Sequence, residues 1–408
     1  MTQALKLGFD VPISRREFIL GSAAALGSLR FGRSAAGAVR AAEAASALPP
    51  PARSGIDHIV VVMMENRSFD HLLGWLPGAD GKQAGLQYVD NGGVSHSTHP
   101  LAPDFQGCGH PDPDHSYEGG RVQYANGACD GFLRSGQNDA YAIGYYTARD
   151  LKFLAPAARY WTVCDRYFAA IMGPTFPNRL YLHAGVTDRT SNTQQLSSLP
   201  TIWDRLAARG LKGRNYFMNV PTVLLWGPKY ASIARPYAEF LLDCRLGRLP
   251  HVAFVDPLFT LSSEGTAADD HPHADIRAGE YFLARTYRAI TTSPAWHRTV
   301  LIVTFDEWGG FFDHVPPPVA PDVDPAYALR GFRVPCLVIS PVARRHRVAH
   351  GVYDHTSILR MIEWRWKLKP LSVRDARANN LANVLDFQHR NLHAPKITAP
   401  RVVGRACP

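Results

Sequence analysis

Four short apolar runs, rich in β-branched residues, stand out along the chain and predict buried strands. They cover residues 58–64, 252–255, 300–305 and 334–339. Their apolar positions are continuous and do not alternate with polar ones, which is typical of strands covered on both faces. The pattern therefore predicts the centre of an α/β fold.

Helical patterns lie between these runs, most clearly over 275–290 and 354–368. Each opens on an aspartate, a residue suited to a helix N-terminus. Strands that are separated by helices predict a largely parallel sheet. The stretch 81–136 is rich in Gly, Asp, Pro and His and has no clear period. We expect it to form long loops over a site and not a separate domain.

Residues 1–44 resemble a twin-arginine export signal. Arg15 and Arg16 precede an apolar stretch that is too short to span a bilayer, and Ala-x-Ala sites follow. We predict cleavage after Ala44, leaving 45–408 as the folded domain. The Ala-x-Ala pattern also fits two other sites, Ala38 and Ala47. Recognition by the twin-arginine (Tat) export machinery would deliver a periplasmic or secreted protein, whereas an ordinary amphipathic N-terminal helix would not be exported.

The charge balance bears on the partners of the protein. The formal charge is +9, and removal of residues 1–44, with six Lys/Arg and three Asp/Glu, leaves +6. The sequence has no dense basic run interleaved with aromatic residues, so it does not predict nucleic-acid binding. The surplus could favour peripheral contact with an anionic membrane surface or phosphorylated substrates, although scattered solvated charges account for most of it. No segment of the mature chain has the length and apolarity of a membrane span.

Six cysteines, at positions 108, 129, 164, 244, 336 and 407, form no CxxC pair and no metal-like spacing with histidine, which excludes a zinc finger. An exported destination permits disulfides. A bond between Cys108 and Cys129 would close a loop, although spacing alone leaves the connectivity open. Cys336 lies in an apolar run, so we expect a buried free thiol.

Two of the predicted strands end in polar residues that point to a metal. The first is followed by Glu65 and Asn66, and the third by Asp306 and Glu307. Open α/β sheets build their sites at these carboxyl ends. Three carboxylates would repel one another unless a cation lay between them, so the pattern predicts one divalent metal ion. Hard oxygen ligands leave its identity open among Ca, Mg, Mn and Zn. Helix capping or exposure to water is the structural alternative.

A turn with Gly173 and Pro174 leads to Thr175, just before a helical pattern that begins near Arg179. Backbone N–H groups at a helix start can hold phosphate, and contact with a metal can activate a hydroxyl as a nucleophile. A threonine at such a place is more often a cap or turn residue. The residue types alone leave both roles open.

Three histidines stand out because each follows an aspartate, which can fix the tautomer of the ring. They are His115, His271 and His355. Phosphoryl transfer requires donors to the equatorial oxygens and a proton for the leaving oxygen, and histidine can supply either. A single histidine is more often a structural residue.

Together these segments resemble a bacterial and plant phosphoesterase family that contains phospholipases C and a type of acid phosphatase. Four motifs occur in the family order between residues 56 and 370, which is a highly specific match. They are Glu65-Asn66-Arg67-Ser68-Phe69-Asp70-His71, Gly173-Pro174-Thr175-x-Pro177-Asn178-Arg179, Asp269-Asp270-His271-Pro272 and Asp306-Glu307-x-Gly309-Gly310-x-x-Asp313-His314-Val315.

The resemblance implies an alkaline-phosphatase-like, three-layer α/β/α sandwich with a largely parallel central sheet. It implies four metal ligands, Glu65, Asn66, Asp306 and Glu307. Thr175 matches the nucleophile, while His115 and His271 match positions that contact the phosphoryl group. Four further residues would support the site: Asp313, His314, Asp354 and His355. His273 departs from the placement in plant relatives and receives no role.

We therefore expect an exported, metal-dependent phospholipase C that hydrolyses glycerophospholipids to diacylglycerol and a phosphorylated head group through a phosphothreonine. Thr175 favours this activity over that of the acid phosphatases, which typically have serine there. An exported acid phosphatase acting on phosphate monoesters is the alternative, and a non-catalytic binding protein is a third reading. The chain ends soon after its last predicted helix, so we expect none of the C-terminal lobes of some bacterial phospholipases C.

Overall fold

The fold is built around one eight-stranded sheet with the order β13-β6-β12-β11-β1-β10-β8-β9. The computed structural model describes residues 48–260 and 266–407, so the predicted export signal and its cleavage site lie outside the described residues. The strands of this sheet are β1 (His58–Met64), β6 (Thr162–Cys164), β8 (Gly213–Phe217), β9 (Ala234–Pro236), β10 (Val252–Asp256), β11 (Thr299–Phe305), β12 (Cys336–Ile339) and β13 (Arg347–Ala349).

The sheet is largely parallel, as predicted. β1 pairs in parallel with both β10 and β11, and β10 pairs in parallel with β8. β12 is antiparallel to its two neighbours, β11 and β6. The continuous apolar runs explain the central strands, because every residue of β11 and all but the first of β1 are buried. The fourth run forms a strand only from Cys336, two residues later than predicted.

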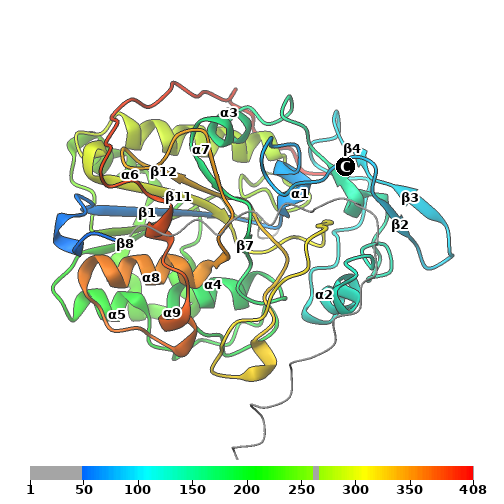
Figure 1. Cartoon of the computed structure of the whole chain (residues 1–408), viewed down its shortest axis with the longest axis horizontal. Helices are drawn as coiled ribbons and strands as arrows, with labels where there is room; N and C mark the ends of the chain where they lie inside the picture. The colour runs from blue at the N-terminus through cyan, green and yellow to red at the C-terminus, as the bar shows by residue number, and fades with distance from the viewer. Residues whose placement is uncertain (1–47, 261–265, 408) are drawn as a thin grey trace, which may run out of the picture. The chain divides into compact units, whose positions relative to one another are not determined.

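Helices cover both faces of the sheet and complete three layers (Figure 1). One face carries α3 (Leu154–Tyr160), α6 (Tyr237–Leu246) and α7 (Ile276–Thr291). The other carries α4 (Thr175–Ala184), α5 (Ile202–Ala207), α8 (His355–Trp366) and α9 (Val373–Arg377). Asp275 and Asp354 cap α7 and α8, as their sequence positions indicated. The three-layer α/β/α prediction is confirmed.

The stretch 81–136 consists mostly of loops but also holds short regular elements that the sequence did not indicate. They are the antiparallel pair β2 (Gln87–Val89) and β3 (Ser95–Ser97), strand β4 (His99–Pro100) and helix α2 (Tyr117–Tyr124). β4 pairs with β5 (Gly144–Tyr145). Two further small elements are helix α1 (Phe69–Leu73), which follows β1, and the parallel pair β7 (Tyr167–Phe168) and β14 (Tyr353–Asp354).

The predicted pairing of Cys108 with Cys129 is wrong. Cys108 is bonded to Cys407, 299 residues later, with 5.3 Å between the Cα atoms, whereas Cys129 is a buried free thiol. The C-terminal tail returns to the end of the molecule that carries α1 and β4 (Figure 1), a tertiary contact that cysteine spacing does not encode. Cys336 is a buried free cysteine, as predicted.

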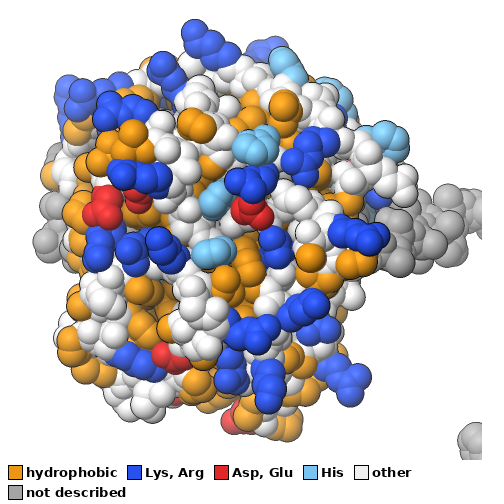
Figure 2. All heavy atoms as spheres, turned by 90° about the vertical axis from the view of Figure 1, so that its left-hand side faces the viewer, with side chains coloured by type: hydrophobic (Ala, Val, Ile, Leu, Met, Phe, Trp, Pro, Cys, Tyr) orange, Lys and Arg blue, Asp and Glu red, His pale blue; other side chains and the backbone are white. Residues whose placement is uncertain are grey.

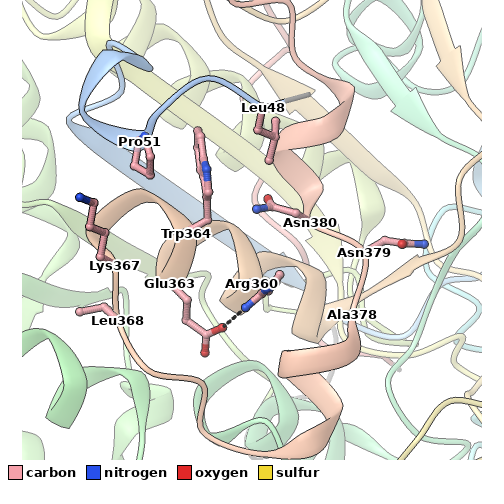
Figure 3. Close-up of a pocket in the computed structure, with 10 residues that line it drawn as sticks. All are labelled: Leu48, Pro51, Arg360, Glu363, Trp364, Lys367, Leu368, Ala378, Asn379 and Asn380. Carbon is pink, nitrogen blue, oxygen red and sulfur yellow. Dashed lines mark ion pairs between the residues drawn. The ribbon is translucent and has the colours of Figure 1, made fainter. Parts of the chain in front are cut away.

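Among the described residues, no helix has both the length and the apolarity to cross a membrane. A pocket of about 540 Å³ lies beside α8 (Figure 3). Trp364 points from that helix toward Leu48 and Pro51, while Glu363 leaves its opposite side and lies 3.9 Å from Arg360. None of the predicted site residues lines this pocket.

Candidate active site

The predicted metal ligands lie side by side because they follow neighbouring parallel strands. Glu65 and Asn66 come directly after β1, and Asp306 and Glu307 directly after β11. The two strands pair in register to their last residues, where Met64 lies opposite Phe305. All four residues are at most 7% exposed. The sheet therefore gathers three carboxylates and one amide in a buried cluster, called here the carboxylate cluster.

Backbone conformation closes this cluster. Asn66 has a φ of 56°, and asparagine tolerates this left-handed region better than most residues. The Asn66 and Glu307 N–H groups both donate to Asp306 Oδ1, at 3.2 and 2.7 Å. Gly309 has a φ of 64°, and a Cβ there would lie 2.1 Å from the Asn66 carbonyl oxygen. The glycine of this motif is thus required for the two strand ends to approach each other.

Two oxygens of the cluster lack hydrogen bonds. Asn66 Oδ1 and Glu307 Oε1 are buried and have no partner in the described structure. Burial and the neighbouring Asp306 raise the pKa of Glu65 well above its usual range and that of Glu307 to about 8. Orphaned hard oxygens and mutually repelling carboxylates are what a divalent cation would satisfy. These residues therefore fit the predicted metal.

Arg179 is a site residue to which the sequence interpretation gave no role. It is 3% exposed, and its guanidinium donates to Glu65 Oε1 at 3.0 Å and to Asp306 Oδ2 at 3.2 Å. Asp256, at the end of β10, lies 3.9 Å away. Arg179 neutralises part of the carboxylate charge and joins α4 to three strand ends. The position of Arg179 in the same motif as Thr175 was the one sequence feature that linked it to the site. Its contacts with Glu65, Asp306 and Asp256 are tertiary, so the sequence did not reveal them.

Thr175 is the first residue of α4, so the helix begins one turn earlier than predicted. Pro174 occupies the N-cap position, and Thr175 is 7% exposed. Among the described residues its hydroxyl makes no hydrogen bond and caps no helix. Because Arg179 lies one turn later on the same helix, the Thr175 end of α4 is tied to the carboxylate cluster.

Asn178, another residue without a predicted role, fixes the turn before Thr175. Its Oδ1 accepts from the Ile171 N–H at 3.0 Å, and its Nδ2 donates to the carbonyls of Ile171 and Gly173 at 3.1 and 2.8 Å. The side chain is fully buried. These bonds hold the backbone on both sides of the turn, which orients the start of α4.

The structure brings His115 and His271 together beside the carboxylate cluster. Their ring centroids are 5.8 Å apart. One ring nitrogen of each histidine and one carboxylate oxygen of Asp112 all lie within 4.8 Å of one another. Asn66 Nδ2 lies 3.1 Å from His115 Nε2, and His115 Nδ1 donates to the Pro113 carbonyl at 2.7 Å. Burial disfavours the charged ring, but the Glu307 and Asp112 carboxylates outweigh it and raise the pKa of His115 to about 9. Two imidazole rings thus border the cluster.

Asp313 and His314 belong to a second network and not to the carboxylate cluster. Arg333, which is fully buried, donates to Asp313 at 2.9 Å and to Asp70 at 3.0 Å. His314 contacts Asp70 through its side chain and its N–H. Because Arg333 already supplies positive charge to both carboxylates, this network supports the fold behind the site. The sequence interpretation gave Arg333 no role.

Asp354 and His355 lie behind the cluster. Asp354 caps α8 by accepting from the Thr356 N–H at 2.9 Å, and it pairs with Arg330 at 2.6 Å. His355 Nε2 donates to the backbone carbonyl of Asp306 at 2.6 Å. Burial lowers the pKa of His355 to about 4, which keeps the ring neutral. His355 therefore positions a predicted ligand and does not itself reach the cluster's side chains.

Comparison with known proteins identifies the family of this chain. The model of the Phosphoesterase family matches residues 56–369. The chain belongs to that family. Phospholipase C B of Mycobacterium tuberculosis is 31% identical over 480 residues, covering 97% of this chain and 91% of the relative. Non-specific phospholipase C1 of Arabidopsis thaliana is 31% identical over 377 residues, covering 81% and 71%. This phosphoesterase and its relatives therefore share most of their length.

Solved structures with a similar fold are more distant. A protein of the alkaline phosphatase superfamily from Vibrio parahaemolyticus is 12% identical, with a TM-score of 0.37 over 56% of this chain and 63% of the other. Phosphonate monoester hydrolase of Agrobacterium radiobacter is 11% identical, with a TM-score of 0.37 over 77% and 74%. Similarity at this level supports no conclusion about chemistry.

Proposed function

We propose that this phosphoesterase is a phospholipase C that cleaves glycerophospholipids into diacylglycerol and a phosphorylated head group. The observation that carries the proposal is the placement of Thr175 one helical turn from Arg179, which contacts Glu65 and Asp306. The Thr175 hydroxyl has no hydrogen-bond partner in residues 48–260 and 266–407. A nucleophile needs such proximity to the groups that manage phosphoryl charge. The names of relatives at 31% identity support the lipid substrate.

In the proposed mechanism the Thr175 oxygen attacks phosphorus in line with the bond to the diacylglycerol oxygen. The new P–O bond forms as the old one breaks, and the His115–His271 pair takes the hydroxyl proton of Thr175 and gives a proton to the departing oxygen. Water then attacks the phosphothreonine, releasing the phosphorylated head group and returning the proton to Thr175. Arg179 keeps the helix that bears Thr175 in place.

A divalent cation held by Glu65, Asn66, Asp306 and Glu307 would supply Lewis-acid stabilisation of the phosphoryl oxygens and of the attacking oxygen. The chain's own contribution is to gather these ligands at the buried ends of β1 and β11, where interactions between charges are stronger than in water. Neutral His355 fixes the backbone of Asp306 from behind. Metal analysis of the purified protein would test this part of the proposal.

We also propose that the protein is exported by the twin-arginine pathway to the periplasm or the medium. The disulfide between Cys108 and Cys407 supports an oxidising destination, because such bonds are rare in the cytosol. Peripheral contact with a membrane surface would follow from a lipid substrate. Fractionation of cells that produce the full chain would test the destination.

A substrate panel tests the activity. Purified mature protein should release phosphocholine from phosphatidylcholine with a much larger kcat/KM than it shows for phosphate release from p-nitrophenyl phosphate. A larger kcat/KM for p-nitrophenyl phosphate would instead support the acid phosphatase alternative. Absence of both activities in metal-replete protein would favour the non-catalytic reading.

A further inference from the structure

A second polar pocket lies at the edge of the sheet opposite the carboxylate cluster. Its volume is about 700 Å³, and several of its lining residues lie at the starts of parallel strands. His58 opens β1, His251 precedes β10, Lys212 precedes β8 and Arg298 precedes β11. Because the cluster follows the other ends of β1 and β11, the length of the sheet separates the two sites.

Positive charge dominates this pocket. Its lining has four cationic side chains, from Lys212, Arg248, Arg298 and Arg365, and one carboxylate, that of Asp57. Figure 2 shows the corresponding face of the molecule, where Lys, Arg and His side chains gather and few acidic ones lie among them. Part of the excess of basic over acidic residues in the sequence is therefore concentrated on this face.

The single carboxylate is already engaged. Asp57 pairs with Arg298 at 2.5 Å and with Arg365 at 3.1 Å. Across the described chain, no acidic partner is found for Lys212 or Arg248, and both side chains are exposed. Lys229, in contrast, pairs with Asp204 at 2.9 Å on the same protein. Two cations therefore face the pocket with their charge uncompensated.

Two histidines form part of the same lining. His251 Nδ1 accepts the Lys212 N–H at 2.9 Å, so the ring proton lies on Nε2 and is available to a ligand. His58 Nδ1 donates to the Pro250 carbonyl at 2.9 Å. Burial first, and then nearby positive groups, lower the pKa of both rings. Crowding of positive charge of this kind is relieved by a bound anion.

We propose that this basic pocket, defined by Lys212, Arg248, His251, Arg298 and Arg365, binds a phosphate-bearing ligand with at least two negative charges. Charge-assisted hydrogen bonds from Lys212 and Arg248 would hold the phosphate oxygens, with the His251 Nε2–H as a further donor. The pocket is large enough for a phosphate ester or a short polyphosphate. The proposal concerns binding alone and does not depend on the chemistry at Thr175.

Isothermal titration of the mature protein with inorganic tripolyphosphate at low salt tests this site. The Lys212→Ala/Arg248→Ala variant should lose one binding event, with affinity at least about tenfold weaker, because it lacks two charge-assisted donors. The matched control, Arg149→Ala/Lys152→Ala, removes the same charge from exposed residues outside the pocket and should bind as wild type does. Equal melting temperatures establish that both variants are folded.

Binding of tripolyphosphate to the pocket variant with wild-type stoichiometry and affinity would overturn the proposal. An equal loss in the control variant would also overturn it, because only overall charge would then matter. Cosedimentation with phosphatidylcholine vesicles that contain phosphatidic acid separates two sources of the ligand. If the wild type and the control variant bind the vesicles and the pocket variant does not, the ligand is a lipid head group. Pocket-dependent tripolyphosphate binding without vesicle binding assigns a soluble phosphate compound.

Discussion

Replacement of Arg179 by methionine would show how strongly the carboxylate cluster depends on its buried counter-ion. The guanidinium is 3% exposed and lies 3.0 Å from Glu65, 3.2 Å from Asp306 and 3.9 Å from Asp256. Methionine preserves much of the volume but leaves these buried carboxylates without their shared cation. Loss of one partner from a buried pair costs about 3–5 kcal/mol. We expect a decrease of that size in the free energy of unfolding.

Urea unfolding of metal-free protein, followed by circular dichroism, would measure this decrease. Arg235→Met is the control, because Arg235 and Glu239 are 32% and 40% exposed and pair at 3.4 Å on the surface. An exposed pair contributes about 0–1 kcal/mol. Arg179→Lys should fall between the two, since an ammonium cannot bond both carboxylates through a planar fork. An Arg179→Met protein within about 1 kcal/mol of wild type would refute the reasoning.

Three further predictions address the metal, pH and export. Asp306→Ala with Glu307→Ala should abolish metal binding and activity while the fold persists, and stoichiometric metal in that variant by elemental analysis would locate the site elsewhere. Burial and the neighbouring Asp375 raise the pKa of Glu363 to about 10, so its contribution to stability is complete below pH about 4 and declines as pH rises toward 10. Glu363→Gln should therefore be more stable than wild type by at least about 1 kcal/mol at pH 8 but not at pH 4, and parallel curves of melting temperature against pH would contradict this. Arg15→Lys with Arg16→Lys should leave the protein in the cytoplasm, and normal export on cell fractionation would disprove the signal.

The central strands and their polar ends were predictable because they depend on local patterns. Continuous β-branched runs mark strands buried on both faces, and β1 has the predicted bounds. Parallel pairing then brings Glu65 and Asp306 to one edge without any further information. The start of α4 was missed because Pro177 resembles a helix breaker. Proline is tolerated in a first turn, where the N–H groups have no helical partner.

The remaining features required the folded chain. Arg179 acts through residues at three strand ends, and nothing in its neighbourhood along the sequence identifies those partners. Cys407 reaches Cys108 only because the C-terminal tail returns across the molecule. The basic pocket gathers residues from turns before four strands, among them Lys212 and Arg298, so composition revealed a surplus of charge but not its location.

Turnover of Thr175→Ala with phosphatidylcholine tests the central claim most directly. Removal of the nucleophilic oxygen should reduce kcat at least about a thousandfold, because the covalent step is lost. The melting temperature should change little, since the hydroxyl makes no hydrogen bond among the described residues. Thr175→Ser, which retains an oxygen at that place, should keep part of the activity. Near-normal turnover of Thr175→Ala would contradict the covalent mechanism.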